Sequence, residues 1–235
     1  MNPVHPFLEE KALPAGGLLV RLGTGHRPMT LKSATLAALR DALDRWEARH
    51  DLRWVAFAAA SPTTFLAGAD FRELGRLDAP GAHAFSGMGQ AFFRRLHESR
   101  LWLVACVEGA CMGGGLDFAL ACDYRIAAPV ARFSHPGPKL GLFTGWGGTA
   151  FLPRRSGLGR GALLTGAVLS ARQALRAGWI EEVAADPVKR AAMRARASAS
   201  LDLARLKRVR RAEGLPLSVG LEYERLLALE PSDEG

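Results

Sequence analysis

The sequence predicts an α/β fold, and three observations support this prediction. Apolar runs of strand length occupy residues 17–22, 54–60 and 101–108. The segment 31–50, between the first two runs, has apolar residues at the spacing of one helix face. Strand–helix–strand order is typical of layered α/β folds. With 49% apolar and 23% charged residues, the 235-residue chain has enough apolar residues for a sizeable core.

The elements of the first half follow from spacing and turn residues. Residues 1–15 contain three prolines and no periodicity, so we expect a loose lead-in before the first strand. Thr30 or Ser33 is expected to cap the helix over 31–50. After the strand at 54–60 we expect a turn at 61–65, a loop that becomes a short helix over 67–77, and a helix over 82–99.

The second half changes from mixed to helical. After the strand at 101–108 and three glycines we expect a helix at 116–122, strands at 124–128 and 132–134, loops at 137–148, and helices at 159–166, 171–177, 188–199, 203–211 and 218–229. The chain therefore divides into a β/α core at 1–183 and a helical C-terminal region at 184–235. This region is expected to pack on the core or on a neighbouring subunit.

Composition excludes several classes of protein. Three cysteines, with no zinc-ligand spacing, do not make a disulfide scaffold or a metal site. No apolar run approaches the roughly 20 residues of a membrane helix, and residues 1–10 lack a signal-peptide pattern, so we expect a cytoplasmic protein. The net charge of +8 permits an anionic partner. The basic stretch 189–211 has no aromatic residue for base stacking, which disfavours nucleic acid.

A glycine cluster is the central chemical feature. Gly113, Gly114 and Gly115 stand between a strand and a helix, where free N–H groups and the helix dipole favour a phosphate or a developing oxyanion. A tight turn is the alternative interpretation. The spacing matches neither a Walker loop nor a dinucleotide fingerprint. A second small-residue loop, 67–70, would add another N–H group and complete a pair of oxyanion donors.

Four stretches in this order resemble the enoyl-CoA hydratase/isomerase (crotonase) superfamily. They read FLAGADFREL, VACVEGACMGGGLDFALACDYRIAA, ARFSHPGPKLGLFTGWGGTAFLPR and LLTGAVLSARQALRAGWIEEV. The resemblance covers about residues 18–183. It implies a crotonase-like spiral of ββα units with a helical C-terminal region, here shorter than is usual in the family, and a homotrimer or a hexamer.

The resemblance also implies site residues. The backbone N–H groups of Ala69 and Gly114 would form the oxyanion hole for a thioester carbonyl. Asp117 stands at the first catalytic glutamate of family hydratases and is expected to move a proton, although an acid in the first helical turn is also favourable through the helix dipole alone. Residues expected to bind coenzyme A or the acyl group are Ala67, Asp70, Phe71, Arg72, Gly113, Gly137 and Trp146.

The sequence diverges from the family at the second catalytic carboxylate, where it has Gly137. A hydratase holds water between an acid and a base, so Asp117 alone argues against simple hydration. His135 is a further candidate for proton transfer, because histidine titrates near neutrality and a strand-like segment would turn residues 135 and 137 to one face. A surface or structural histidine is the alternative.

The loop 135–147 resembles that of 1,4-dihydroxynaphthoyl-CoA synthases and ring-opening ketoacyl-CoA hydrolases, some of which hold bicarbonate. We therefore expect a gap at Gly137 that accepts a bulkier substrate, a bicarbonate or another small anion. Trp146 or Phe143 could close this gap. The catalytic aspartate of those enzymes falls on Thr144 here.

These observations predict an enzyme that acts on an acyl-CoA or acyl-carrier-protein thioester through a stabilised enolate, of lyase, isomerase or hydratase type. No metal or redox cofactor is implied. The alternatives are a non-catalytic acyl-CoA-binding pseudoenzyme, a hydrolase of a C–C bond in a 3-ketoacyl thioester, and a basic RNA-binding or interaction protein.

Overall fold

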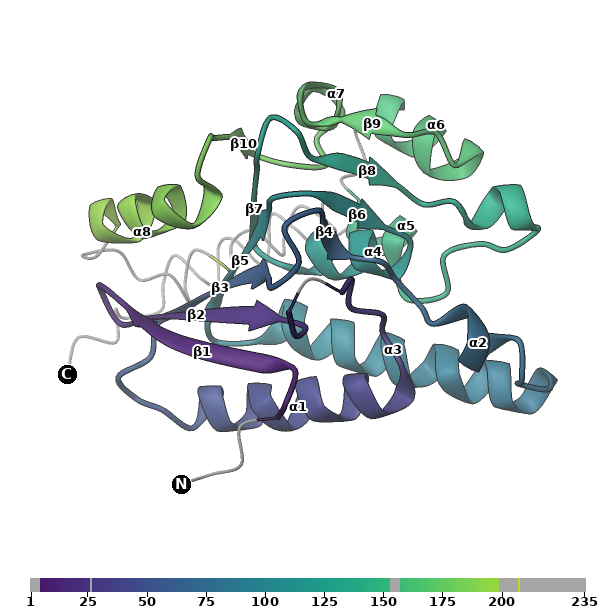
Figure 1. The fold of residues 1–235 in the computed structure, drawn as a ribbon, viewed down its shortest axis with the longest axis horizontal. Helices are drawn as coiled ribbons and strands as arrows, with labels where there is room; N and C mark the ends of the chain where they lie inside the picture. The colour runs from purple at the N-terminus through teal and green to yellow at the C-terminus, as the bar shows by residue number, and fades with distance from the viewer. Residues whose placement is uncertain (1–4, 26, 153–156, 199–206, 208–235) are drawn as a thin grey trace, which may run out of the picture.

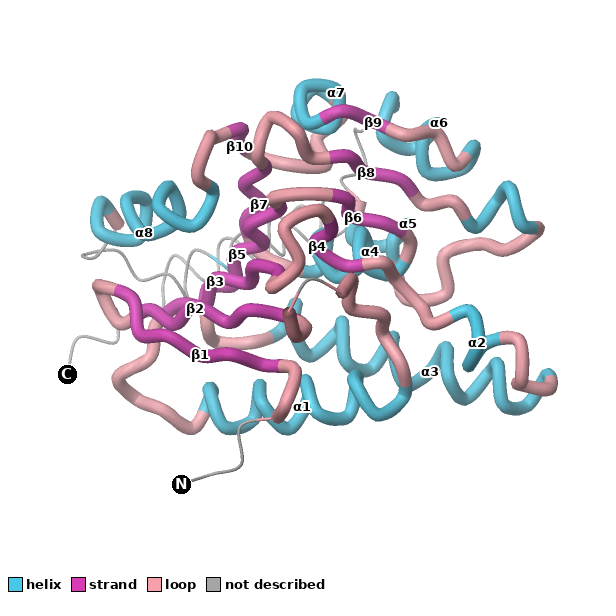
Figure 2. Tube along the Cα trace, viewed as in Figure 1, coloured by secondary structure: helices cyan, strands magenta, loops and turns pink. Residues whose placement is uncertain are grey.

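The structure is a computed structural model that describes residues 5–25, 27–152, 157–198 and 207. Its larger sheet has six strands in the order β1-β2-β3-β5-β7-β10 (Figures 1 and 2). Only the β1–β2 pair is antiparallel, and every other pair in this sheet is parallel. The strands are β1 (Leu8–Leu13), β2 (Gly17–Leu22), β3 (Trp54–Ala59), β5 (Trp102–Val107), β7 (Tyr124–Ala127) and β10 (Glu182–Val183).

Strand β1 corrects the expectation of a loose lead-in. It pairs with β2 from Leu8 opposite Leu22 to Leu13 opposite Gly17. Ala15 and Gly16, with φ of 56° and 65°, turn the chain between the two strands. Most side chains of β1 are exposed, so this edge strand has no apolar alternation for the sequence to reveal.

Helices cover both faces of the large sheet. Helices α1 (Ser33–Glu47) and α3 (Ala79–Glu98) lie side by side on one face, and α8 (Pro187–Ala197) lies on the other (Figure 1). Strand β3 is consequently buried at every position. Its alternate residues divide between two cores: Phe57 packs with the α1 and α3 side, and Trp54 packs with Ala191 of α8.

A second sheet of short strands produces the repeat that the resemblance implies. Its order is β4-β6-β8-β9, formed by β4 (Thr64–Leu66), β6 (Ala110–Met112), β8 (Arg132–Ser134) and β9 (Leu169–Ser170). A strand of the large sheet, a strand of the small sheet and then a helix follow one another along the chain, which confirms the spiral of ββα units. Strand β6 also corrects one expectation, because the three glycines follow β6 and not β5.

The remaining helices are α2 (Phe71–Leu74), α4 (Gly114–Ala121), the 3-10 turn η1 (Gly137–Leu140), α5 (Gly148–Phe151), α6 (Gly157–Thr165) and α7 (Ala171–Arg176). The expected cap of α1 is wrong: its N-cap is Lys32, which makes no side-chain cap bond. The carboxylate of Glu73 instead accepts from the N–H of Ser33, at 3.2 Å, and from its hydroxyl group, at 2.5 Å.

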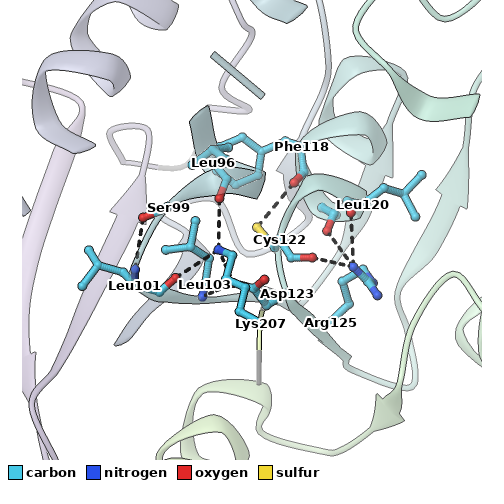
Figure 3. A network of polar contacts seen from close by, with 11 residues as sticks. Leu96, Ser99, Leu101, Leu103, Phe118, Leu120, Cys122, Asp123, Arg125 and Lys207 are labelled. Atoms are coloured by element: carbon cyan, nitrogen blue, oxygen red, sulfur yellow. Dashed lines mark hydrogen bonds and ion pairs between the residues drawn. The ribbon is translucent and has the colours of Figure 1, made fainter. Parts of the chain in front are cut away.

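The C-terminal region meets the core at Lys207. Its buried ammonium group donates to the carbonyl oxygens of Leu96 and Leu101, both at 3.2 Å, and to Oδ2 of Asp123 at 2.7 Å (Figure 3). Apart from residue 207, the helices expected at 203–211 and 218–229 lie outside the described residues. In the described ranges, no helix is long and apolar enough to span a membrane.

Candidate active site

Two loops meet beside the ends of β4 and β6, which are parallel neighbours. Parallel strands end at the same edge of a sheet, so the loops that follow them are brought together. Gly68 makes the contact possible. Its φ is 90°, and a Cβ at this position would lie 2.7 Å from the carbonyl oxygen of Met112 and 2.8 Å from the nitrogen of Gly114. Any side chain at residue 68 would therefore push the loops apart.

This approach brings the N–H groups of Ala69 and Gly114 close together. The nitrogen of Ala69 lies 3.5 Å from where a Cβ of Gly114 would be. Leu31 fixes the first loop, because its N–H donates to Gly68 and its carbonyl oxygen accepts from Asp70. Within the described ranges, no hydrogen bond uses the N–H of Ala69 or of Gly114. Two neighbouring donors, one of them at the N-terminus of α4, are an arrangement that can stabilise a developing oxyanion.

Asp117 lies one helical turn after Gly114, and its side chain is 1% exposed. Its Oδ2 accepts a hydrogen bond of 2.9 Å from the hydroxyl group of Thr144. The N–H of Gly148, the first residue of α5, donates to the same hydroxyl oxygen at 3.0 Å. A side chain at residue 148 would overlap Oδ1 of Asp117, so this glycine leaves room for the carboxylate. No role was expected of Thr144 from the sequence. The only signal was its place at the catalytic aspartate of the related loop.

His135 lies beside Asp117 and is buried. Its Nε2 is 3.6 Å from Oδ2 of Asp117, and among the described residues its Nδ1 has no hydrogen-bond partner. The neighbouring Ser134 is fixed from two sides, since it accepts from the N–H of Gly113 and donates to the carbonyl of Gly166. The structure thus rejects a surface histidine at position 135. It also corrects the strand-like geometry, because β8 ends at Ser134 and a 3-10 turn begins at Gly137.

The space at Gly137 is bordered closely by His135 and Leu142. A Cβ there would lie 3.2 Å from Cε1 and Nδ1 of His135 and 3.0 Å from the carbonyl oxygen of Leu142. Phe143 does not close this space, because its side chain is 74% exposed. Trp146 is not among the nearest neighbours either. The binding of a bicarbonate or another small anion beside Gly137 stays a prediction.

Trp146 forms an apolar wall beside Gly114. A side chain on Gly114 or on Gly89 of α3 would overlap the indole ring. The indole N–H donates to the carbonyl oxygen of Phe85 at 3.3 Å, and the ring packs edge-to-face against Phe85 and Phe93. Gly89 and Gly114 leave room for the indole ring, and the rings of Phe85 and Phe93 pack against it.

Some of the residues expected to bind coenzyme A form hydrogen bonds within the protein, and others have exposed side chains that a ligand can contact. Asp70 caps α2 by accepting from the N–H groups of Arg72 and Glu73, and it also accepts from the hydroxyl group of Thr30. The N–H of Ala67 donates to the carbonyl of Met29. These hydrogen bonds give Asp70 and Ala67 structural roles in the loop before α2. Phe71 is 58% exposed, and Arg72 is exposed without an ion pair in the described part of the chain.

The opposite end of α4 is held by a buried arginine (Figure 3). Nη1 of Arg125 donates to the carbonyl oxygens of Leu120 and Cys122 at 3.3 and 2.7 Å, and Nη2 forms an ion pair with Glu181. A cation at a helix C-terminus satisfies free carbonyl groups and matches the helix dipole. Arg125 thereby fixes the helix that carries Gly114 and Asp117.

The ββα spiral, the paired N–H donors and the buried carboxylate define a protein of the crotonase class. The sequence profile of the enoyl-CoA hydratase/isomerase family matches residues 19–207, and the chain belongs to this family. It is 37% identical to the alpha subunit of a fatty acid oxidation complex from Idiomarina loihiensis. The match extends over 164 residues and covers 68% of this chain. The chain spans only 23% of the length of that curated relative.

Solved structures show the same fold over nearly the whole chain. An enoyl-CoA hydratase from Geobacillus kaustophilus superposes with a TM-score of 0.88 at 26% identity, covering 99% of this chain and 91% of that one. An enoyl-CoA hydratase from Bacillus anthracis gives a TM-score of 0.87 at 25% identity and covers 94% and 89%.

Proposed function

We propose that this chain is an enzyme that forms an enolate from an acyl thioester of coenzyme A or of a carrier protein. The observation that carries the proposal is the pair of N–H groups at Ala69 and Gly114, which make no hydrogen bond within the described part of the chain, with the buried carboxylate of Asp117 one helical turn after Gly114. Membership of the family supports a thioester substrate.

The proposed chemistry assigns one role to each group. The thioester carbonyl oxygen accepts hydrogen bonds from the N–H groups of Ala69 and Gly114. Asp117 takes the proton when the C–H bond next to the carbonyl breaks, and the electron pair moves to the thioester oxygen. One such donor typically lowers a barrier by about 3 kcal/mol. The hydroxyl group of Thr144 orients the carboxylate through its 2.9 Å hydrogen bond.

Substrate binding and assembly belong to the same proposal. Phe71 and Arg72, exposed just after the Ala69 loop, are expected to contact the pantetheine and adenine parts of coenzyme A. We also expect a cytoplasmic homotrimer or hexamer. Light scattering coupled to size-exclusion chromatography tests the assembly, and a monomer would contradict it.

The test is exchange of α-protons in deuterium oxide, followed by mass spectrometry. Saturated, enoyl and 3-ketoacyl-CoA thioesters are each incubated with the wild type and with Asp117→Asn. Asp41→Asn is the matched control, because Asp41 is an exposed residue of α1. We expect exchange with the wild type and the control, and its loss with Asp117→Asn.

The other outcomes separate the alternatives. Binding of acyl-CoA without exchange would contradict the proposal and favour a pseudoenzyme. Cleavage of the 3-ketoacyl thioester between its carbon atoms would identify the C–C bond hydrolase. Absence of binding to any thioester, together with salt-sensitive binding to RNA, would identify a basic interaction protein.

A further inference from the structure

Asp117 and His135 form a buried pair with two unsatisfied polar atoms. Over the described residues, four buried side-chain nitrogen or oxygen atoms lack a hydrogen-bond partner, and two of them are Oδ1 of Asp117 and Nδ1 of His135. A buried polar atom that is left unpaired is unfavourable, because it loses its hydrogen bonds to water. Each of these two atoms is therefore able to bind a polar ligand or a water molecule.

The imidazole of His135 lies directly beside the position where a side chain of residue 137 would begin. The ring atoms Cε1 and Nδ1 are 3.2 Å from the position of a Cβ on Gly137. A larger residue at 137 would press on the ring. The glycine and the histidine thus form one arrangement, in which His135 takes the space that a longer side chain at 137 would need.

The pairing with Asp117 fixes which nitrogen is available. An ionised carboxylate only accepts hydrogen bonds, so the imidazole faces Asp117 with Nε2–H. In the neutral ring this leaves Nδ1 as an acceptor. The distance of 3.6 Å between Nε2 and Oδ2 is slightly longer than a hydrogen bond, and catalytic contacts of this kind shorten when substrate binds.

We propose that His135 is the second catalytic residue of this site and that the reaction adds water to, or removes it from, the C2–C3 bond of an acyl thioester. The inference rests on the proposed function, because it uses the same oxyanion donors and the same aspartate. It assigns to an Asp–His pair the acid and base work that two carboxylates perform in family hydratases.

The step balances in the direction of hydration. The water O–H bond breaks, its proton goes to Nδ1 of His135, and the oxygen bonds to C3. The electron pair of the C2=C3 bond passes to the thioester oxygen, held by the N–H groups of Ala69 and Gly114. Nε2 of His135 passes its proton to the ionised carboxylate of Asp117, which gives it to C2 as the carbonyl re-forms. One proton enters the ring at Nδ1 and one leaves it from Nε2, so the pair holds as many protons as at the start. Loss of the Nδ1 proton to water and protonation of Nε2 then restore the starting ring.

The experiment measures two activities in the same variants. Hydration of 2-enoyl-CoA thioesters of several chain lengths is followed by formation of the 3-hydroxyacyl-CoA, and α-proton exchange is followed on a saturated acyl-CoA. The variants are His135→Ala, His135→Gln and the double variant His135→Ala/Gly137→Glu. His83→Ala is the matched control, because His83 is an exposed histidine of α3.

The expected result is a split between the two activities. His135→Ala and His135→Gln lose hydration by about 10²–10⁴-fold, the usual contribution of a general acid or base, and lose much less of the α-proton exchange, because that exchange uses Asp117 and the oxyanion donors. The double variant recovers part of the hydration, because its carboxylate occupies the vacated space. A merely structural histidine would not give this split or this recovery. If His135→Ala does not fold, His135→Gln, which keeps a side-chain N–H toward Asp117, carries the comparison.

Two results would overturn the inference and leave the proposed function standing. One is hydration that stays near the wild-type rate in both His135 variants. The other is a wild type that exchanges α-protons but hydrates no enoyl thioester of any length. If the wild type exchanges no α-proton at all, the proposed function itself fails.

Discussion

Trp146 lies so close to Gly114 that a side chain at residue 114 would overlap the six-membered part of the indole ring. The N–H of Gly114 is therefore next to an apolar surface. Hydrogen bonds to a developing negative charge are stronger in such surroundings than in water. The tryptophan thus serves the oxyanion site in two ways, by excluding water and by limiting the space beside it.

Shortening Trp146 is expected to change which acyl groups react. Trp146→Phe leaves space between Gly89 and Gly114, so kcat/KM should rise for longer or branched acyl groups relative to short ones. Trp146→Ala should also lower the free energy of unfolding by about 3–5 kcal/mol, as for other buried aromatic residues. The measurement is kcat/KM over a series of acyl-CoA lengths, with denaturant unfolding of each variant. An unchanged length profile in Trp146→Phe would show that the indole does not border the acyl group.

Gly68→Ala should disable the oxyanion hole. The added methyl group would lie 2.7 Å from the carbonyl of Met112 and 2.8 Å from the nitrogen of Gly114, at a φ of 90°. The two loops must separate, and we expect a loss of about 10²–10³-fold in rate, the usual effect of one lost donor. Gly141→Ala is the matched control, because Gly141 also has a positive φ, 71°, but has open space around it. Equal activity losses in both variants would attribute the effect to backbone strain alone.

The sequence predicted the fold class and most long elements, and it missed those whose cause is not local. Strand β1 has mostly exposed side chains, so only its pairing with β2 defines it. Strand β6 has three residues, too few for any period. In the site, the glycine cluster indicated a position for a phosphate or an oxyanion, and the family resemblance implied Gly114 as one donor. The contact between Thr144 and Asp117 joins residues 27 positions apart, and no local pattern encodes it.

Lys207→Met should destabilise the protein strongly. Lys207 and Asp123 are each 2% exposed, and removing one partner of a buried ion pair leaves an uncompensated charge. We expect the free energy of unfolding to fall by about 3–5 kcal/mol. The double variant Lys207→Met/Asp123→Asn should recover part of this loss, because it removes the unpaired charge. The amide oxygen of the new side chain at residue 123 can still accept from the N–H of Leu103. Arg94→Met is the control, because the exposed Arg94–Glu98 pair contributes only about 0.3–0.5 kcal/mol. Denaturant titration distinguishes these cases, and a loss no larger than that of the control would contradict a buried pair.

Cys106 and Cys111 should resist thiol reagents in the folded protein. Both are fully buried, and burial raises the pKa of each thiol well above its usual value, so little thiolate forms at neutral pH. Mass spectrometry after treatment with a maleimide should find both thiols unmodified in native protein and modified in denaturant. Rapid native labelling of Cys111, which lies two residues before Gly113, would mean that β6 opens easily and that the oxyanion loop is not rigid.

Asp70 should make stability depend on pH in the acidic range. A hydrogen bond from Thr30 and the N–H groups at the start of α2 lower the pKa of this carboxyl group. A carboxylate with a lowered pKa in the folded state contributes stability above its unfolded value, about pH 4, and this contribution disappears as the pH falls through the folded value. Wild type should therefore exceed Asp70→Asn in unfolding free energy at neutral pH, and the difference should shrink below about pH 4.

Asp70 directly follows Ala69, so its cap can also hold the oxyanion donor in place. If it does, Asp70→Asn should lose α-proton exchange as well as stability. Full exchange in a destabilised Asp70→Asn would assign loop position to Leu31 instead, whose backbone bonds to Gly68 and Asp70 the substitution leaves intact.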